Sequence, residues 1–238
     1  MNSTRLNNPL HTIIVSDIHL GSLLSRANHL TKLLKERSFK RLILLGDIFD
    51  DLNLNRLTPE HWEFLAYVRE LSENGRHIDV VWAQGNHDAR VANVMKILGG
   101  IPVYHEYAWE MNGKKYLAIH GDVFDSYLFN DNIFGNTIRL FYRIIEKIDR
   151  GEKSLTRFIG RCHTIWLRIS PRVAHGAAQH AKKHGFDYIF CGHTHEAIHR
   201  VFFEKEKPVH YFNTGCWIQS PSTYIAITDD GAVSICKF

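Results

Sequence analysis

The stretch HTIIVSDIHLGS, residues 11–22, contains the first strand of the chain and the polar block that follows it. Its apolar, β-branched run ends at Val15, and Asp17-Ile18-His19 comes almost directly after it. The same arrangement recurs in RLILLGDIFD, residues 41–50, and the leucines of Leu23–Arg37 between the two runs have helical spacing. The chain therefore begins with a strand, helix, strand unit, which predicts an α/β fold.

The pattern continues with a helix expected over Thr58–Asn74 and with a series of short strands. Thr58 is suited to cap that helix and Pro59 to its first turn, while Asn112-Gly113 is the turn signal of a hairpin. The expected strands are His11–Val15, Arg41–Leu45, Ile78–Ala83, Val103–Trp109, Tyr116–Ile119, Tyr188–Cys191, Ile198–Phe203, His210–Asn213, Thr223–Thr228 and Ala232–Lys237. These elements predict a single α/β domain over residues 1–238.

Residues 126–186 differ in character and predict long amphipathic helices, with breaks near Gly151, Pro171 and Gly185. The segment has 11 basic and 4 acidic residues, so its net charge of +7 exceeds the +4 of the whole chain. We interpret it as a basic helical cap inserted into the domain. Its local charge favours an anionic substrate or membrane surface. Its interleaved aromatic residues and leucines leave two alternatives, which are packing against the domain or a groove for an acyl chain or lipid surface.

The composition is that of a folded protein, with 238 residues, 45% of them hydrophobic and 23% charged. The apolar runs are too short for a transmembrane helix, and MNSTRLNNPLHT lacks the apolar core of a secretory signal. The four cysteines are widely separated, which predicts neither a disulfide framework nor a thiolate zinc site. We therefore expect a cytoplasmic protein, and no pattern indicates an oligomeric state.

Five polar blocks end apolar runs: Asp17-Ile18-His19, Gly46-Asp47-Ile48-Phe49-Asp50, Gly85-Asn86-His87-Asp88, His120-Gly121-Asp122 and Gly192-His193-Thr194-His195. Ligands in α/β folds gather beyond the carboxyl ends of the strands, so we expect the blocks to converge. Their carboxylates, amide and imidazoles are donors for Mn, Fe or Zn. Each block alone also fits an ordinary turn or hydrogen-bonded loop. Together they indicate a metal site.

In this order the blocks resemble the signature of the calcineurin-like metallophosphoesterases, which is DxH, GDxxD, GNHD, a later histidine and GHxH. The resemblance covers Val15–His195 and implies a two-sheet β-sandwich flanked by helices, with a dinuclear metal centre. It implies that Asp17, His19, Asp47 and His195 hold one divalent ion, and that Asp47, Asn86, His120 and His193 hold the other. Mn is the favoured metal, and Fe and Zn are the alternatives.

The reaction that suits such a centre is phosphoester hydrolysis. Two cations about 4 Å apart lower the pKa of a shared water and clamp a phosphoryl oxygen for in-line attack. By the same resemblance, His87 contacts the phosphate and protonates the leaving group. Asp88 is adjacent in the sequence, and we expect it to orient His87. We interpret Asp50 and Asp122 as carboxylates that hydrogen-bond the imidazoles of metal ligands.

Within that family, the chain is similar to the branch of UDP-2,3-diacylglucosamine diphosphatases, hydrolases of the lipid A pathway. The similarity rests on the DIHLGS block, on the helical insertion and on Asn213-Thr214-Gly215-Cys216-Trp217. The chain departs from that branch at His87, where arginine is typical, and at Ile218, where histidine is typical. The resemblance implies a nucleotide-linked or amphipathic substrate, with peripheral contact of the cap with the inner membrane.

Two alternative functions differ from this one. A phosphodiesterase or phosphatase could act on nucleotides or nucleic acid, but no aromatic stacking platform supports nucleic acid as the partner. A non-catalytic, metal-binding interaction module could keep the fold without the reaction. The presence of every ligand residue together with His87 argues against that module.

Overall fold

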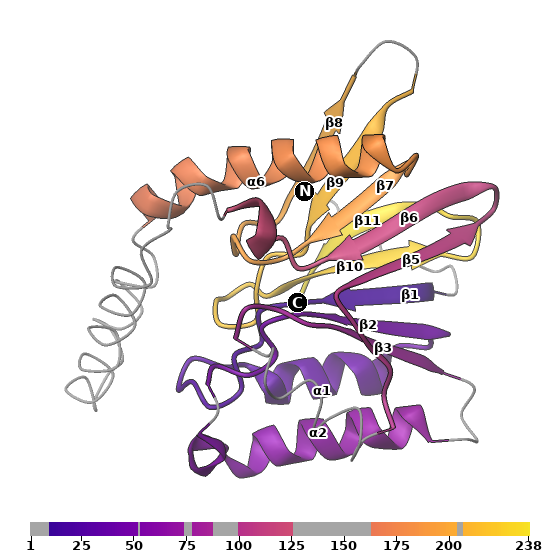
Figure 1. Ribbon diagram of the computed structural model, residues 1–238. Coiled ribbons are helices and arrows are strands. Elements are labelled where there is room, and N and C mark those ends of the chain that lie inside the picture. The colour runs from indigo at the N-terminus through magenta and orange to yellow at the C-terminus, as the bar shows by residue number, and fades with distance from the viewer. Residues whose placement is uncertain (1–9, 52, 74–77, 88–99, 126–162, 204–206) are drawn as a thin grey trace.

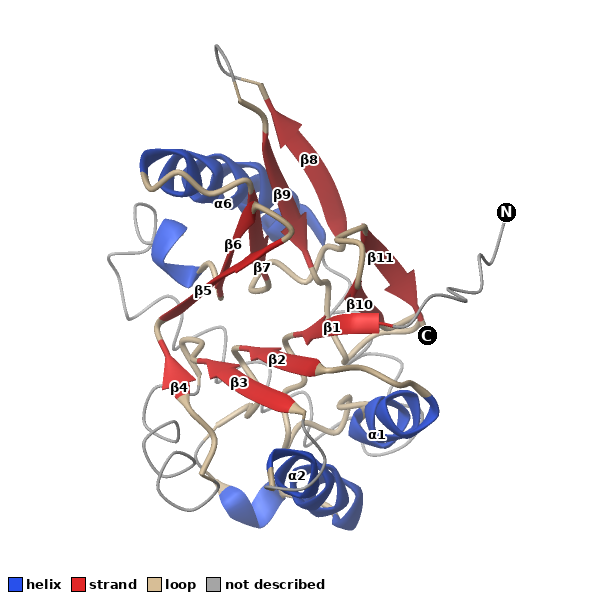
Figure 2. Cartoon of the chain, turned by 90° about the vertical axis from the view of Figure 1, so that its right-hand side faces the viewer, coloured by secondary structure: helices blue, strands red, loops and turns tan. Residues whose placement is uncertain are grey.

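The computed structural model describes residues 10–51, 53–73, 78–87, 100–125, 163–203 and 207–238. Two sheets stack face to face, and helices cover the outer face of each sheet (Figure 1, Figure 2). This arrangement confirms the predicted α/β architecture of two sheets flanked by helices.

The first sheet has six strands in the order β11-β10-β1-β2-β3-β4, and the second has five in the order β5-β6-β7-β9-β8. The elements are β1 (Leu10–Val15), α1 (Ala27–Glu36), β2 (Arg41–Leu45), the 3-10 turn η1 (Leu54–Arg56), α2 (Pro59–Ser72), β3 (Asp79–Ala83), β4 (Val103–Tyr104), β5 (Glu106–Met111), β6 (Lys114–Ile119), the 3-10 turn η2 (Asp122–Phe124), α6 (His163–Lys183), β7 (Tyr188–Cys191), β8 (Ile198–Phe202), β9 (Val209–Asn213), β10 (Thr223–Thr228) and β11 (Val233–Lys237).

The apolar strands are buried on both faces. In β1, Ile13 and Val15 pack toward α1 and α2, whereas Ile14 packs between the two sheets. Successive side chains of a strand point to opposite faces, so an uninterrupted apolar run fits a strand that is covered on both sides. The continuous hydrophobic runs seen in the sequence therefore follow from the layered arrangement.

Helix α6 covers the outer face of the second sheet, where Ala174, Ala177, Ala178 and Ala181 pack against its strands. This helix is the described part of the predicted cap, and residues 126–162 lie outside the described residues. The predicted break at Pro171 is wrong, because the helix continues through this proline. The predicted break at Gly185 is confirmed. Gly185 has a φ of +76°, and Phe186 N–H donates to the Ala181 carbonyl.

Two other boundaries differ from prediction. The helix expected from Leu23 begins only at Ala27, because the Ser25 hydroxyl donates to the Ile18 carbonyl and holds the preceding residues in a loop. The strand expected over Val103–Trp109 is two strands in different sheets. The chain bends at His105 and crosses from the first sheet to the second there.

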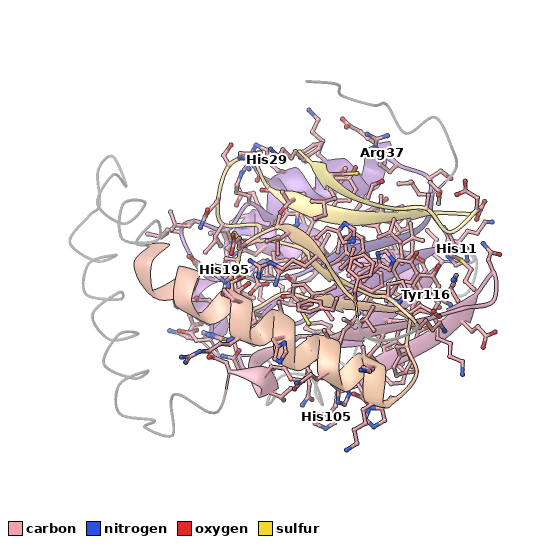
Figure 3. All side chains as sticks on the ribbon, turned by 90° about the horizontal axis from the view of Figure 1, so that it is seen from above. His11, His29, Arg37, His105, Tyr116 and His195 are labelled. Carbon is pink, nitrogen blue, oxygen red and sulfur yellow. The ribbon has the colours of Figure 1, made fainter. Side chains whose placement is uncertain are left out.

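The strands bring their carboxyl ends to one edge of the molecule. Strands β1, β2 and β3 are parallel in the first sheet, and β6, β7 and β9 are parallel in the second. Figure 3 shows His195, which follows β7, at one end of the stacked sheets and His11, near the start of β1, at the other. Among the described helices, none combines the length and the apolar character needed to cross a membrane.

Candidate metal centre

The polar blocks meet where the two sheets end. Asp17 follows β1, Asp47 follows β2, His120 follows β6, and His193 and His195 follow β7. The described residues form three groups of potential ligands: Asp17, His19 and His195; Asp47, His120 and His193; and His19, Asp50 and His87. Within each group, the ligand atoms lie within 4.8 Å of one another. Residues from five loops are therefore close enough to share ions.

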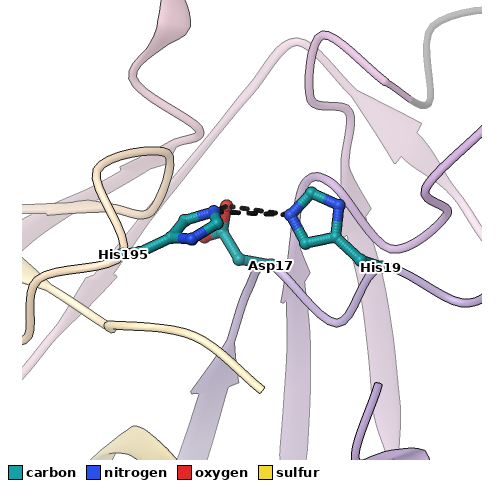
Figure 4. A group of neighbouring side chains, drawn as sticks. All are labelled: Asp17, His19 and His195. Atoms are coloured by element: carbon teal, nitrogen blue, oxygen red, sulfur yellow. Dashed lines mark hydrogen bonds and ion pairs between the residues drawn. The ribbon is translucent and has the colours of Figure 1, made fainter. Parts of the chain in front are cut away.

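The first group surrounds a buried carboxylate (Figure 4). Asp17 Oδ1 is 3.1 Å from His195 Nε2 and 3.9 Å from His19 Nε2, and the two imidazole nitrogens are 3.4 Å apart. The other carboxylate oxygen, Oδ2, accepts a hydrogen bond of 3.0 Å from the His193 backbone N–H. That bond directs Oδ1 toward the two imidazoles.

The second group has the same construction. Asp47 Oδ2 is 3.4 Å from His120 Nε2 and 3.8 Å from His87 Nε2. Its Oδ1 accepts a hydrogen bond of 2.9 Å from the His87 backbone N–H. In both groups a backbone N–H of another block binds one carboxylate oxygen, and the remaining oxygen faces histidine side chains.

The loops that carry these side chains have unusual backbone conformations. Six of the described residues other than glycine have a positive φ. Five of them belong to the centre: Asp17 (52°), His19 (49°), Asp47 (51°), His193 (65°) and His195 (55°). Left-handed conformations of such residues cost free energy and cluster at functional sites. Packing from both sheets must therefore hold these loops in place.

Glycines leave space for the carboxylates and imidazoles. A Cβ on Gly85 would collide with Asp47 Oδ1, and one on Gly192 would collide with Ser16 Oγ and Asp17 Oδ2. A Cβ on Gly46 would collide with His120. The glycines of the GD, GN and GH blocks are thus needed because neighbouring ligands approach the backbone closely.

Three histidines of the centre each have one ring nitrogen near an oxygen atom. His120 Nδ1 is 2.9 Å from the Leu45 carbonyl, and His193 Nε2 is 3.1 Å from Asp125 Oδ2. His19 Nδ1 makes no hydrogen bond, and the oxygen beside it is Asp50 Oδ1, at an ion-pair distance of 3.5 Å. Oxygen partners of this kind fix the orientation and tautomer of histidines that bind metals. Nε2 of His19 and His120 is then the nitrogen available to a metal, as is Nδ1 of His193.

The electrostatics of the centre favour a cation. Burial alone would raise the pKa of the Asp47 carboxyl, but His120 outweighs burial and holds that pKa well below its usual value. His195 likewise lowers the pKa of Asp17 against the effect of burial. Although burial opposes it, Asp50 and Asp47 raise the pKa of His19 to about 9. Protonated imidazoles thus supply, in the ion-free protein, the positive charge that buried carboxylates require.

Three buried atoms of the centre lack hydrogen bonds. They are Asp17 Oδ1, His19 Nδ1 and His120 Nε2, and none of them is accessible to solvent. Leaving such atoms without a hydrogen bond costs free energy, so each calls for an explanation. Asp17 Oδ1 and His120 Nε2 are atoms that divalent metals accept as ligands, and both face other potential ligands. The residues present therefore fit a metal ion.

The remaining predicted residues have different surroundings. His87 is half-buried, with Nδ1 2.6 Å from the Asp50 carbonyl oxygen. Asn86 lies in the turn after β3 and is exposed. Asp88 lies outside the described residues. Asp122 begins η2, and the carboxylate that reaches an imidazole from this loop belongs to Asp125 instead.

Sequence reasoning missed Asp125, and also Ser16 and Thr214. The hydroxyl of Ser16 donates to Asp17 Oδ2 and contacts the hydroxyl of Thr214. A signal for Asp125 was present, because Gly121-Asp122-Val123-Phe124-Asp125 repeats the pattern of Gly46-Asp47-Ile48-Phe49-Asp50. In both copies the last aspartate faces a histidine of another block.

Comparison with known proteins adds a family and a fold. The model of a family described as calcineurin-like phosphoesterase matches residues 10–197, which contain all five blocks. A solved archaeal phosphodiesterase has a TM-score of 0.50 at 14% identity, covering 95% of this chain and 99% of that chain. Vps29 from Cryptosporidium parvum has a TM-score of 0.49 at 13% identity, covering 97% and 98% of the two chains. No curated protein matches this chain.

Proposed function

The chain belongs to the calcineurin-like phosphoesterase family, a family of phosphoester hydrolases, and from this premise we propose that it hydrolyses phosphoester or diphosphate bonds at a centre of two divalent metal ions. The observation that carries the proposal is the pair of groups Asp17, His19, His195 and Asp47, His120, His193. Each has a carboxylate and two imidazoles, and each has a buried side-chain atom without a hydrogen bond.

Each residue of the centre has a role in this proposal. Asp17, His19, Asp47 and His195 hold one ion, and Asp47, Asn86, His120 and His193 hold the other. When bound, the ions supply an activated water and neutralise the phosphoryl oxygens. Because the ligands are oxygen and imidazole nitrogen without thiolate, Mn is the proposed metal, with Fe and Zn as alternatives.

His87 is proposed as the general acid. Its Nδ1 lies 2.6 Å from the Asp50 carbonyl oxygen, which can only accept, so Nδ1 carries a proton. Its Nε2 then faces the centre, 3.8 Å from Asp47 Oδ2. A proton on Nε2 is transferred to the leaving oxygen as water oxygen bonds to phosphorus. Asp88 follows directly in the sequence and is proposed to orient His87.

For the substrate, we propose a UDP-2,3-diacylglucosamine-like molecule, with phosphate bound at the centre and an apolar part outside it. Three loops that carry residues of the centre also present exposed apolar side chains, those of Leu23 (49% exposed), Leu54 (48%) and Val123 (53%). Residues 213–217, where the chain is similar to the diphosphatase branch, have another role. Trp217 N–H donates to the Asp17 carbonyl at 3.0 Å, so this segment supports the centre. The basic segment 126–186 is proposed to contact the anionic substrate or the membrane surface.

The test is a substrate panel with metal-stripped protein to which Mn is added back. It contains UDP-2,3-diacylglucosamine, nucleotide sugars, cyclic nucleotides and an aryl phosphodiester, with products identified by mass. We expect hydrolysis of the diphosphate to UMP and the lipid monophosphate. Asp47→Ala serves as the control that should turn over nothing.

Other outcomes separate the parts of the proposal. Turnover of the aryl ester alone keeps the two-metal hydrolase and rejects the lipid-linked substrate. Turnover of cyclic nucleotides establishes the alternative phosphodiesterase. If wild-type protein with bound Mn turns over nothing, hydrolysis is rejected in favour of a metal-binding interaction module.

A further inference from the structure

We propose that Arg56 is a positioning residue that sets the geometry of His19 and His87 through Asp50. This inference rests on the proposed function, in which His19 binds a metal ion and His87 transfers a proton. Arg56 ends η1, outside the blocks that identify the family, and its side chain reaches back to the GDxxD loop.

Arg56 connects two neighbouring carboxylates. Its Nη1 is 2.6 Å from Asp50 Oδ2 and 2.7 Å from Asp51 Oδ2. The three side chains are only 22%, 22% and 18% exposed, so solvent screens these ion pairs less than it screens pairs on an open surface. Such short, partly buried contacts hold a carboxylate in one orientation.

Asp50 in turn faces both histidines. Its Oδ1 is 3.5 Å from His19 Nδ1, and its backbone carbonyl oxygen is 2.6 Å from His87 Nδ1. Its backbone N–H donates to the Leu20 carbonyl at 2.9 Å, which anchors the loop to the block that contains His19. With Oδ2 held by Arg56, Oδ1 remains directed at His19. One residue therefore orients a metal ligand with its side chain and the proposed acid with its backbone.

The surroundings of Arg56 favour positioning over direct binding of phosphate. Its single positive charge already faces the two carboxylates of Asp50 and Asp51. The guanidinium and these two carboxylates together carry a net charge of −1. A phosphate would be repelled by that net charge, whereas an uncompensated Asp50 beside His19 would lose its fixed orientation. The turn itself is also defined, since Asp51 Oδ1 accepts from Asn53 N–H at 2.9 Å.

The experiment compares Arg56→Met and Arg56→Lys with Arg41→Met. Arg41 is a matched control, because its side chain is 19% exposed and its Nε is 2.6 Å from Asp79 Oδ2. It begins β2, whereas the centre lies beyond the other end of this strand. Mn affinity is measured by calorimetry on metal-stripped protein. On the aryl phosphodiester, kcat, KM and inhibition by inorganic phosphate are measured with saturating Mn.

We expect Arg56→Met to weaken Mn binding about 10- to 100-fold and to lower kcat while KM and the phosphate inhibition constant stay nearly unchanged. Arg56→Lys should recover part of the Mn affinity, and Arg41→Met should keep all of it. Unchanged Mn affinity in Arg56→Met overturns the inference. A rise confined to KM and the phosphate inhibition constant also overturns it, because that result indicates direct contact between Arg56 and phosphate.

A second variant covers misfolding of Arg56→Met. Asp50→Asn keeps Arg56 and the Asp50 backbone carbonyl and removes the carboxylate charge between Arg56 and His19, so a loss of Mn affinity is expected, and full affinity would overturn the inference. The Mn titrations need no substrate. If the wild-type protein hydrolysed no phosphoester, the proposed function would fail while these titrations would still decide the role of Arg56.

Discussion

Single residues in the centre are held in conformations that they would not adopt alone. Asp17 and Asp47 both have left-handed backbones, and each accepts a backbone N–H from a block on another strand. The strain is tolerated because those bonds, together with the surrounding packing, determine the position of each carboxylate. Substitutions here should therefore separate metal binding from proton transfer.

Asp47→Asn and His87→Ala should have different effects. Asp47→Asn removes the charge next to His120 and the carboxylate that is proposed to hold both ions, so we expect loss of metal and a fall in turnover of at least about a hundredfold. His87→Ala should keep the metal and lower kcat by about 10²- to 10⁴-fold. Metal content by elemental analysis, measured together with steady-state rates, checks both. An unchanged rate in His87→Ala would show that this residue is not the acid.

Gly192→Ala should damage the centre through a single methyl group. The new Cβ would collide with Ser16 Oγ and Asp17 Oδ2, so we expect Mn affinity to fall by at least about tenfold. Gly113→Ala is the control, because its φ of +70° makes alanine strained while no atom lies within 4 Å of the added carbon. That variant should lose about 1 kcal/mol of stability and keep its Mn affinity. Equal Mn affinities in the two variants would contradict this account.

At the scale of elements, strand ends supply the ligands and short turns supply their partners. Turn η1 brings Arg56 to Asp50, and the loop after β6 brings Asp125 to His193. Helix α6 supports that loop, because a Cβ on Gly176 would come within 3.2 Å of Phe124 Cβ. The helix therefore contributes to the centre through packing.

Pro171 should be a weak point of α6. It lies inside the helix, is exposed, and has no N–H for the carbonyl four residues earlier. We expect Pro171→Ala to raise the free energy of unfolding by up to about 3 kcal/mol, measured in urea. Pro59→Ala is the control, since Pro59 is in the first turn of α2, where the missing N–H costs little. Equal effects of the two substitutions would be inconsistent with this explanation.

At the scale of the whole molecule, the centre couples folding to protons and metal. In the metal-free protein the pKa of His19 is raised from 6.5 to about 9, so the protonated ring stabilises the folded state. That stabilisation is complete below pH 6.5 and is lost as the pH rises through 9. The lowered pKa values of Asp17 and Asp47 act in the other direction, and their contribution is lost as the pH falls below 3.8.

The metal-free protein should therefore lose stability between pH 6.5 and 9, by an amount on the order of 3 kcal/mol for His19. Mn requires deprotonated imidazoles, so the stabilisation that it confers should grow over the same interval. Melting temperatures measured with EDTA and with Mn across this interval test both statements. His19→Gln should reduce the slope of the EDTA curve, and His120, whose pKa is also raised well above 6.5, should supply the rest. A metal-free wild type that gains stability over this interval would refute the prediction.

The sequence by itself determined the order of the strands that end in polar blocks, the glycines beside them and the oxygen and imidazole chemistry of the centre. These features are local, because an apolar run and the polar residue that ends it are neighbours in the chain. Only the tertiary structure decided that Val103–Trp109 crosses between sheets, that Asp125 rather than Asp122 reaches His193, and that Arg56 holds Asp50. Such contacts depend on how separate loops pack against one another, and residue spacing alone does not specify that packing.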